Sequence, residues 1–300
     1  MYQQYNMKTA ALLYVRNDGY KENERVIACL SSMLDTFDEV ILLDWNSPEG
    51  KKPLLWEIKD RLPKTGKIRH YVIAPEIVSQ LIPYPNASKC NETLSRNIAI
   101  KRSDADWIVS TSIDIIPPKR EDLIKTIETL DKNTFYTVSR REAPLSIIKK
   151  YTTDEWPLLR EELYNTIPER HFPGMVSPND KYSLINCCGD FQLAHKDLWS
   201  SIKGFEENMI YTCFSDTNVQ KKAVIGGFNL EVLYNPPLFH MEHEPYSVTE
   251  KGERIKSETF HESSKSVVYN DVWDYVEYFQ STSNSDSWGL GNTEIEFEVF

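Results

Sequence analysis

Polar side chains directly follow three short apolar runs in the first half of the chain. The runs 10–15, 39–43 and 107–113 are followed by Arg16, Asn17 and Asp18, by Asp44, and by Asp114, respectively. If the runs are parallel strands, their carboxyl ends meet in one crevice, which is where α/β sheets bind ligands. Each of these residues taken alone could simply make a turn. Their joint placement favours a binding site.

Two histidines late in the chain, His240 and His243, are the best candidates to share a divalent cation with the Asp114 carboxylate. Carboxylate and imidazole together suit Mn²⁺, with Mg²⁺ or Zn²⁺ as alternatives. Residues three apart in an extended segment point to opposite faces, so both histidines reach one ion only if the chain turns between them. The alternative is that both rings are merely packed or hydrogen-bonded.

The first 130 residues alternate between short apolar runs and segments with apolar residues at helical spacing. The predicted strands are 10–15, 39–43, 67–74 and 107–113, and the predicted helices are 24–34, 53–62 and 91–102. Pro53 suits the first turn of the second helix. This alternation predicts an α/β fold with a parallel, doubly wound sheet that is flanked by helices.

The pattern is less regular after residue 132. We predict strands at 134–139 and 230–234, an extended segment at 183–193, helices at 153–167, 196–202, 216–225 and 267–279, and loops at 168–179 and 281–287. No low-complexity linker separates the two halves. We therefore predict a single domain at residues 1–246, with halves 1–130 and 131–246, followed by an acidic C-terminal extension at 247–300.

The charge balance argues against polyanionic partners. The chain has 34 Lys and Arg against 45 Asp and Glu, a net charge of −11. Such a chain is a poor candidate to bind a nucleic-acid backbone or an anionic membrane. Residues 251–300 hold four basic and ten acidic residues, so much of the excess lies at the end of the chain. A small anionic ligand is still possible in the first 250 residues, where local cations or a metal supply the field.

The sequence also bears on location. No apolar run approaches the roughly 18 residues that cross a bilayer, and residues 1–8 lack a signal-peptide core. The five cysteines are an odd number without a CxxC pair, which fits reduced thiols better than a disulfide framework. We therefore expect a soluble, cytoplasmic protein without a transmembrane segment.

The most informative stretch runs from residue 95 to residue 118. It contains Ser95-Arg96-Asn97-Ile98-Ala99, then Asp106-Trp107-Ile108, then Ser112-Ile113-Asp114-Ile115-Ile116-Pro117. It resembles the RN-x-G … D-x-D-x-x-P segment of GT-A glycosyltransferases. Further similar segments are Leu43-Asp44-Trp45, Gly189-Asp190-Phe191-Gln192, Gly204-Phe205-Glu206-Glu207, Ser215-Asp216 and Phe239-His240-Met241-Glu242-His243. The resemblance spans roughly residues 9 to 245, including a galactosyltransferase-like second half, and rests on order and spacing.

The resemblance implies a GT-A-like fold and transfer of a sugar, with inversion, from a nucleoside diphosphate to a carbohydrate hydroxyl, as in polysaccharide biosynthesis. A UDP-sugar is the favoured donor. Asp44 and the turn at Arg16, Asn17 and Asp18 would read the base, and Arg96 and Asn97 would contact the nucleotide sugar. The alternative for Arg96 and Asn97 is a solvated helix face.

A metal is also implied. Asp114 and His240, and His243 if the chain turns, would hold Mn²⁺ against the diphosphate, where a cation stabilises the developing charge. The first acid of D-x-D is Ser112 here. That leaves metal dependence open, because Arg96, Arg16 or Lys101 could meet the diphosphate instead.

An inverting transfer needs a base that deprotonates the acceptor hydroxyl. The resemblance assigns this role to Asp216, although an Asp before an apolar helix is also a good N-cap. Asp190 could hold substrate hydroxyls or sit in a turn. Trp45 could stack on the substrate or belong to the core.

Two other functions stay open. A non-catalytic nucleotide-sugar-binding protein on the same fold becomes more credible because Ser112 replaces an acid. A sugar-1-phosphate nucleotidyltransferase would want a glycine-rich, lysine-containing loop after the first strand. Residues 15–22 hold one glycine and one lysine, which makes this the weaker alternative.

Overall fold

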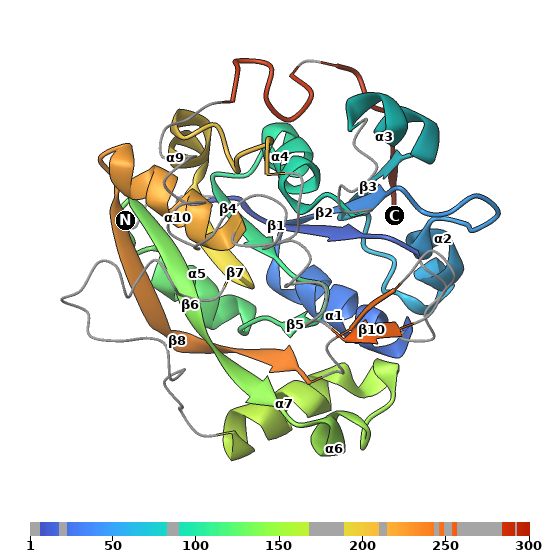
Figure 1. The fold of residues 1–300 in the computed structure, drawn as a ribbon. Helices are drawn as coiled ribbons and strands as arrows, with labels where there is room; N and C mark the ends of the chain where they lie inside the picture. Colours follow the sequence, from blue (N-terminus) through green and yellow to red (C-terminus); the bar gives the residue numbers. More distant parts are fainter. Residues whose placement is uncertain are drawn as a thin grey trace.

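The fold is built around a nine-stranded sheet with helices on both faces (Figure 1). The computed structural model describes residues 7–17, 23–82, 90–167, 189–209, 215–242, 246–248, 254–256, 284–291 and 293–300. In the order in which they lie side by side, the strands are β11 (Phe297–Val299), β3 (Ile68–Ile73), β2 (Glu39–Trp45), β1 (Thr9–Val15), β4 (Trp107–Thr111), β7 (Phe191–His195), β6 (Thr134–Ala143), β8 (Asn229–Met241) and β5 (Ile115–Ile116). A separate pair joins β9 (Tyr246–Val248) to β10 (Arg254–Lys256).

The sheet is mixed and mainly parallel. Strand β1 pairs in parallel with β2 and β4, β2 with β3, and β6 with β8. Strand β7 lies antiparallel between β4 and β6, while β5 and β11 pair antiparallel with β8 and β3. The predicted α/β class, with a mainly parallel sheet flanked by helices, is confirmed, and each of these antiparallel pairs includes a strand after residue 132, where the sequence pattern is less regular.

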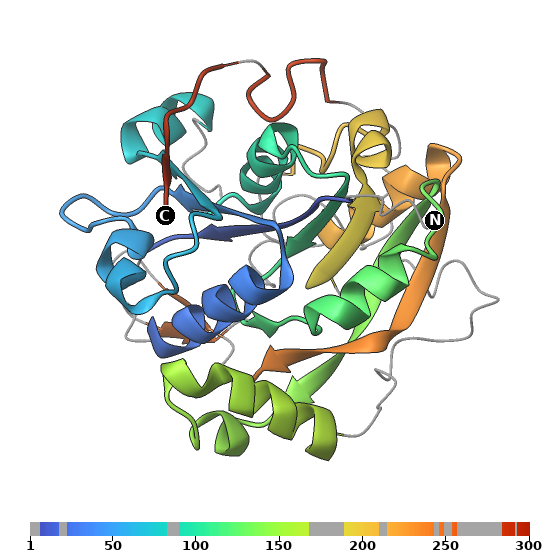
Figure 2. The same ribbon diagram turned by 180° about the vertical axis from the view of Figure 1, so that it is seen from behind.

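The helices form two layers, which Figure 1 and Figure 2 show from opposite sides. One layer contains α1 (Asn23–Thr36), α2 (Leu54–Ile58), α5 (Arg120–Ile127) and α7 (Trp156–Thr166), whose apolar residues share one buried cluster with the sheet. The other contains α3 (Pro75–Leu81), α4 (Glu92–Arg102), α9 (Lys196–Ser201) and α10 (Ser215–Ile225). The helix α6 (Leu145–Ile148) and the 3₁₀ turns Lys59–Arg61 and Thr153–Glu155 complete the described elements.

The sequence misses some elements and shortens others. Helices α3 and α5 were not predicted, and strand β8 continues to Met241 rather than ending near residue 234. Pro236 and Pro237 argue against a central strand because proline cannot donate to a ladder. Strand β6 still pairs with this stretch, across a register shift between Val138 and Arg140. The predicted helix 267–279 and the loop 168–179 lie outside the described residues.

The end of the chain returns to the sheet. Strand β11 pairs with β3 and lies next to the C label in Figure 1. Trp288 is buried against the layer that contains α4. The described parts of the predicted extension, 284–291 and 293–300, thus pack on the main body. The domain boundary after residue 246 stays a prediction.

Helix α4 begins at a side-chain cap. The Oδ1 atom of Asn91 accepts a hydrogen bond of 2.8 Å from the backbone N–H of Leu94, and Asn91 is buried. We expect Asn91→Ala to lower the free energy of unfolding by about 1 kcal/mol, because a first-turn donor loses its acceptor. Urea unfolding measures this. The exposed Asn229→Ala is the matched control and should stay within about 0.5 kcal/mol of wild type.

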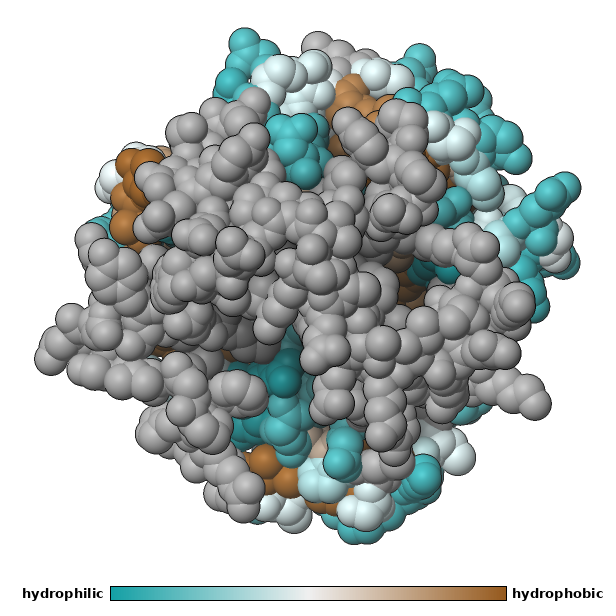
Figure 3. Space-filling view, in the orientation of Figure 1, coloured by the Kyte–Doolittle hydropathy of each residue, from teal (hydrophilic) through white to brown (hydrophobic). Residues whose placement is uncertain are grey.

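The described surface on the face seen in Figure 1 is largely hydrophilic, with apolar residues in small separate areas (Figure 3). Within the described residues, no helix combines the length and apolar character that crossing a membrane requires.

Candidate active site

The ends of β1 and β2 are joined by side-chain hydrogen bonds. The Oδ1 of Asp44 accepts from the Ser47 hydroxyl at 2.5 Å, and its Oδ2 accepts from the Leu54 N–H at 2.8 Å, at the start of α2. The backbone N–H of Asn17 donates to the same Ser47 hydroxyl at 2.9 Å, and Arg16 Nε donates to the Asn46 carbonyl at 2.8 Å. The carboxyl ends of β1 and β2 therefore lie together, as the sequence predicts.

These bonds hold Asp44 and Asn17 in place at the ends of β2 and β1, and the reading of the base by these two residues stays a prediction. Asp44 is fully buried, and burial raises its pKa although its two hydrogen bonds oppose this. Asn17 is also buried, and its side-chain N–H donates to the Lys52 carbonyl. Arg16 is partly exposed, so it is the residue of this turn that offers a cation to the crevice. Asp18 lies outside the described residues.

Cys90 precedes α4 and has a strongly shifted thiol pKa. Burial raises the pKa of its thiol to about 12, and the charges of Glu92, Arg16, Asp44 and Arg96 act on it. Glu92 and Asp44 raise this pKa further, whereas Arg16 and Arg96 oppose the shift.

Arg96 is a buried cation that is held on several sides. It donates to the Ser110 hydroxyl and to the Glu92 carboxylate, both at 2.6 Å, and its guanidinium lies over the Tyr14 and Phe205 rings. Burial disfavours its charge, but Glu92 and Tyr14 together outweigh this effect and the pKa of Arg96 rises. Arg96 is therefore committed to internal partners.

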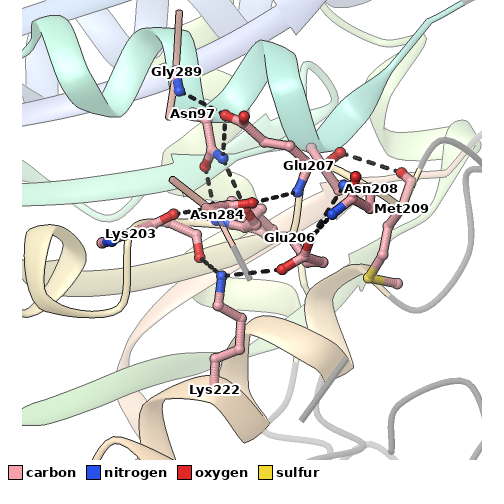
Figure 4. Close-up of polar contacts among 12 residues, drawn as sticks. Asn97, Lys203, Glu206, Glu207, Asn208, Met209, Lys222, Asn284 and Gly289 are labelled. Carbon is pink, nitrogen blue, oxygen red and sulfur yellow. Dashed lines mark hydrogen bonds and ion pairs between the residues drawn. The ribbon is translucent and has the colours of Figure 1, made fainter. Parts of the chain in front are cut away.

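Asn97 faces the turn at residues 203–207 (Figure 4). It is fully buried, accepts from the Phe205 N–H at 2.7 Å, and donates to the Phe205 carbonyl and to Glu207. These bonds commit both polar atoms of the Asn97 side chain to internal partners, and its contact with the nucleotide sugar stays a prediction. Trp45 is likewise fully buried in the core cluster that packs under α4, which favours the core alternative, while its contact with the substrate stays a prediction.

Asp114 and His240 lie close together where β5 pairs with β8, on the opposite side of β4 from β1 and β2. Their Oδ2 and Nε2 atoms are 3.5 Å apart, and His240 Nδ1 lies 2.7 Å from Glu142 Oε2. Residue 240 is opposite residue 115 on β5 and residue 142 on β6, so strand register explains the meeting. Burial lowers the pKa of His240, but hydrogen bonds to Asp114 and Glu142 outweigh it and raise the value to about 9.

Arg140 joins this group to Asp190. It pairs with Glu142 Oε1 at 2.8 Å through Nε and with Asp190 Oδ2 through Nη1. The Ser112 hydroxyl donates to the other oxygen of Asp190 at 3.3 Å. Acidic and basic side chains thus alternate in one connected row: Asp190, Arg140, Glu142, His240 and Asp114.

Asp216 lies in the first turn of α10, against Gly189. A Cβ atom at Gly189 would stand 2.4 Å from the Cβ of Asp216, so the approach requires a glycine. Burial, together with the negative charges of Glu92 and Asp190, raises the pKa of the Asp216 carboxyl to about 6, while Thr217 N–H and Arg96 oppose the shift. Asp216 keeps partial solvent exposure.

The donor set at Asp114 and His240 fits a cation that takes two protein ligands. One carboxylate oxygen and one imidazole nitrogen face each other, and a phosphate-bound divalent ion needs few protein ligands because phosphate oxygens and water supply the rest. No group of three or more His, Cys, Asp or Glu side chains in the described part of the chain is arranged for a metal. His243 lies outside that part.

Sequence analysis missed Arg140 and Glu142. The predicted strand ended at residue 139, whereas β6 continues to Ala143. Two charged residues spaced two apart share one face of a strand. That alternation is the signal that could have indicated them.

The fold is that of the GT-A glycosyltransferases. Residues 1–349 of S. aureus TarS, in complex with UDP-GlcNAc, match with a TM-score of 0.50 and 13% identity, over 91% of this chain and 70% of that chain. Another crystal structure of S. aureus TarS matches at 0.48 and 12% identity over 91% of this chain, which spans 42% of that chain.

A mannosyltransferase is also similar. PcManGT from Pyrobaculum calidifontis, in complex with GDP-Man and Mn²⁺, matches with a TM-score of 0.49 and 12% identity, over 81% of this chain and 58% of that chain. No protein-family model matches the chain, and no curated protein matches its sequence. At these identities the likeness establishes the fold alone.

Proposed function

We propose that this chain is a glycosyltransferase that moves a sugar from a nucleoside diphosphate donor to a hydroxyl of a carbohydrate acceptor. One observation carries the proposal: Asp114, Asp190, His240 and Asp216 are gathered near the carboxyl end of β4, linked or held close by the contacts described above. Ligands of α/β sheets bind at this end. A UDP-sugar is the donor that we propose, on the resemblance and on the TarS fold.

On the donor side, Asp114 and His240 would hold Mn²⁺ or Mg²⁺, and His240 would give up the proton on Nε2 to do so, because an imidazole must be neutral to bind a metal. The ion, when bound, supplies positive charge that stabilises the leaving diphosphate. Arg16 is partly exposed beside Asp44 and provides a second cation for the nucleotide. Glu142 fixes the orientation of the His240 ring through Nδ1, which directs Nε2 toward Asp114.

On the acceptor side, Asp216 receives the proton of the acceptor hydroxyl. The acceptor oxygen bonds to the anomeric carbon while the bond from that carbon to the diphosphate breaks, and the proton remains on a carboxylate oxygen of Asp216. Asp190 accepts a hydrogen bond from a substrate hydroxyl, and Arg140 and Ser112 hold it in place. Attack from the face opposite the diphosphate inverts the anomeric carbon.

The rate of transfer should depend on the ionisation of Asp216. The base must be deprotonated to accept a proton, and its pKa is raised to about 6. We therefore expect the rate to fall as pH drops through about 6 and to approach a tenfold loss per pH unit below it. A profile of kcat against pH measures this, and a flat profile from pH 7 to pH 4.5 in a folded enzyme contradicts the assignment.

Calorimetry tests the function as a whole. UDP should bind in the presence of Mn²⁺, and a screen of UDP-sugars should find one that is consumed, by hydrolysis or by transfer to an added oligosaccharide. Binding without turnover would support the non-catalytic alternative that Ser112 raises. Release of diphosphate from a nucleoside triphosphate and a sugar 1-phosphate would support the nucleotidyltransferase.

We also propose a cytoplasmic location, on the cysteine content of the sequence. Cell fractionation with the source organism tests it, and recovery in a secreted fraction would overturn it.

A further inference from the structure

A buried network joins the end of the chain to the turn at residues 203–207 (Figure 4). Asn284 is 6% exposed and makes three hydrogen bonds there. Its Oδ1 accepts from the Glu207 N–H at 3.0 Å, and its Nδ2 donates to the carbonyls of Lys203 at 2.8 Å and Phe205 at 2.5 Å. One side chain of the last segment therefore holds the backbone of this turn at three points.

Glu207 makes the second link. Its Oε1 accepts from the Asn97 side chain at 2.9 Å and from the Gly289 N–H at 2.6 Å. Gly289 has a φ of 61°, and a Cβ there would stand 2.6 Å from the Asn97 carbonyl oxygen. The turn, α4 and the last segment thus meet at one carboxylate, and the approach requires glycine at residue 289.

The same turn holds α10. Lys222 Nζ donates to the Gly204 carbonyl at 2.8 Å and lies 4.0 Å from Glu206 Oε2, and both charged side chains are fully buried. Lys222 is on the helix whose first turn contains Asp216. A continuous set of contacts therefore runs from residues 284–291 through the turn to the helix of the candidate base.

The last segment is fixed on α4 as well. Arg102 donates to the carbonyls of Gly289 at 2.7 Å and Thr293 at 2.8 Å, and Lys101 Nζ lies 4.7 Å from the centre of the Trp288 ring. These contacts fix residues 284–291 to α4. Helix α4 therefore supports the segment where it contacts the turn at residues 203–207.

We propose that residues 284–291 act as a brace for α10 and that Asn284 and Glu207 are positioning residues for the Asp216 carboxylate. The claim that residues 284–291 hold α10 in place stands on the contacts alone. The claim that this affects sugar transfer rests on the proposed function. One of the two positioning residues, Asn284, thus lies 68 places after the base in the chain.

Asn284→Ala tests the brace. We expect faster hydrogen exchange in peptides of α10, a kcat lower by about tenfold to a hundredfold, and a UDP affinity within about twofold of wild type. We also expect the acid limb of the pH profile to move below 6, because a loosened helix lets water reach Asp216 and weakens the burial that raises its pKa. Partial unfolding would lower the amount of active enzyme without moving that limb.

Asp286→Ala is the matched control. Asp286 belongs to the same segment but is 99% exposed, and it pairs with Lys203 at the surface. We expect wild-type exchange, kcat and pH profile, since exposed pairs contribute little.

If Asn284→Ala does not fold, two variants of Glu207 test the brace instead. Glu207→Gln keeps the oxygen that accepts from Asn97 and Gly289, so its α10 exchange and acid limb should match wild type, whereas Glu207→Ala should reproduce the loosened state. Unchanged α10 exchange in both Asn284→Ala and Glu207→Ala would overturn the brace. Absence of UDP binding and turnover in wild type, with faster exchange in the variants, would instead overturn only the proposed function.

Discussion

Asp216→Asn is expected to lower the rate of sugar transfer on the order of 10²- to 10⁴-fold, which is the range that a general base contributes. Asparagine keeps the size of the side chain but cannot take the acceptor proton. The backbone contacts at this position, such as the bond from Gln192 to the carbonyl of residue 216, do not depend on the carboxylate. Helix α10 should therefore stay in place, and calorimetry should find UDP binding within about twofold of wild type.

Asp197→Asn serves as the control for this result, because Asp197 also lies in the first turn of a helix but is exposed. Its turnover should equal that of wild type. Turnover at the wild-type level in Asp216→Asn would remove Asp216 from the mechanism. Loss of UDP binding together with turnover would instead assign it to the donor.

Asp114→Asn is expected to have the second largest effect, a loss of about 100-fold in transfer together with weaker UDP binding in the presence of Mn²⁺. The variant removes the charge that faces His240 Nε2 at 3.5 Å and would contribute to holding the ion. Calorimetry of UDP with and without Mn²⁺, and paramagnetic resonance of Mn²⁺ itself, measure the loss separately from turnover. The exposed Asp104→Asn is the control.

Chelation gives an independent measure of the same role. An excess of chelator should reduce transfer by wild type at least as much as the substitution does, and added Mn²⁺ should restore it. Full activity in the chelator, with UDP affinity unchanged in Asp114→Asn, would assign the diphosphate to protein cations such as Arg16.

The first half of the fold was predictable because its signals are local. Apolar runs bounded by turn residues indicated β1 to β4 within a few residues, and helical spacing indicated α1 and α4. The second half depends on contacts between distant segments. The prolines in β8 hide the second part of this strand, residues 235–241, which only pairing with β6 and β5 reveals, and β11 is too short to stand out in an acidic stretch.

The candidate site divides in the same way. Asp114 and Asp216 stand at element ends, which a sequence pattern can locate, and the structure places them near His240 and Asp190, respectively. Burial is decided by packing, so the pattern could not tell that Asn97 and Trp45 point into the interior. Arg140 reaches Asp190 because two strands align, which no short motif encodes.

Strand β11 has a consequence for solubility. It covers the edge of β3, a strand of sequence Ile-Arg-His-Tyr-Val-Ile whose backbone groups would otherwise be open to pairing with another molecule. Glu294, Glu296 and Glu298 alternate with apolar residues along this outer segment. Pairing of a second molecule edge to edge along β11 would bring these carboxylates together, so we expect their charge to oppose such pairing at neutral pH.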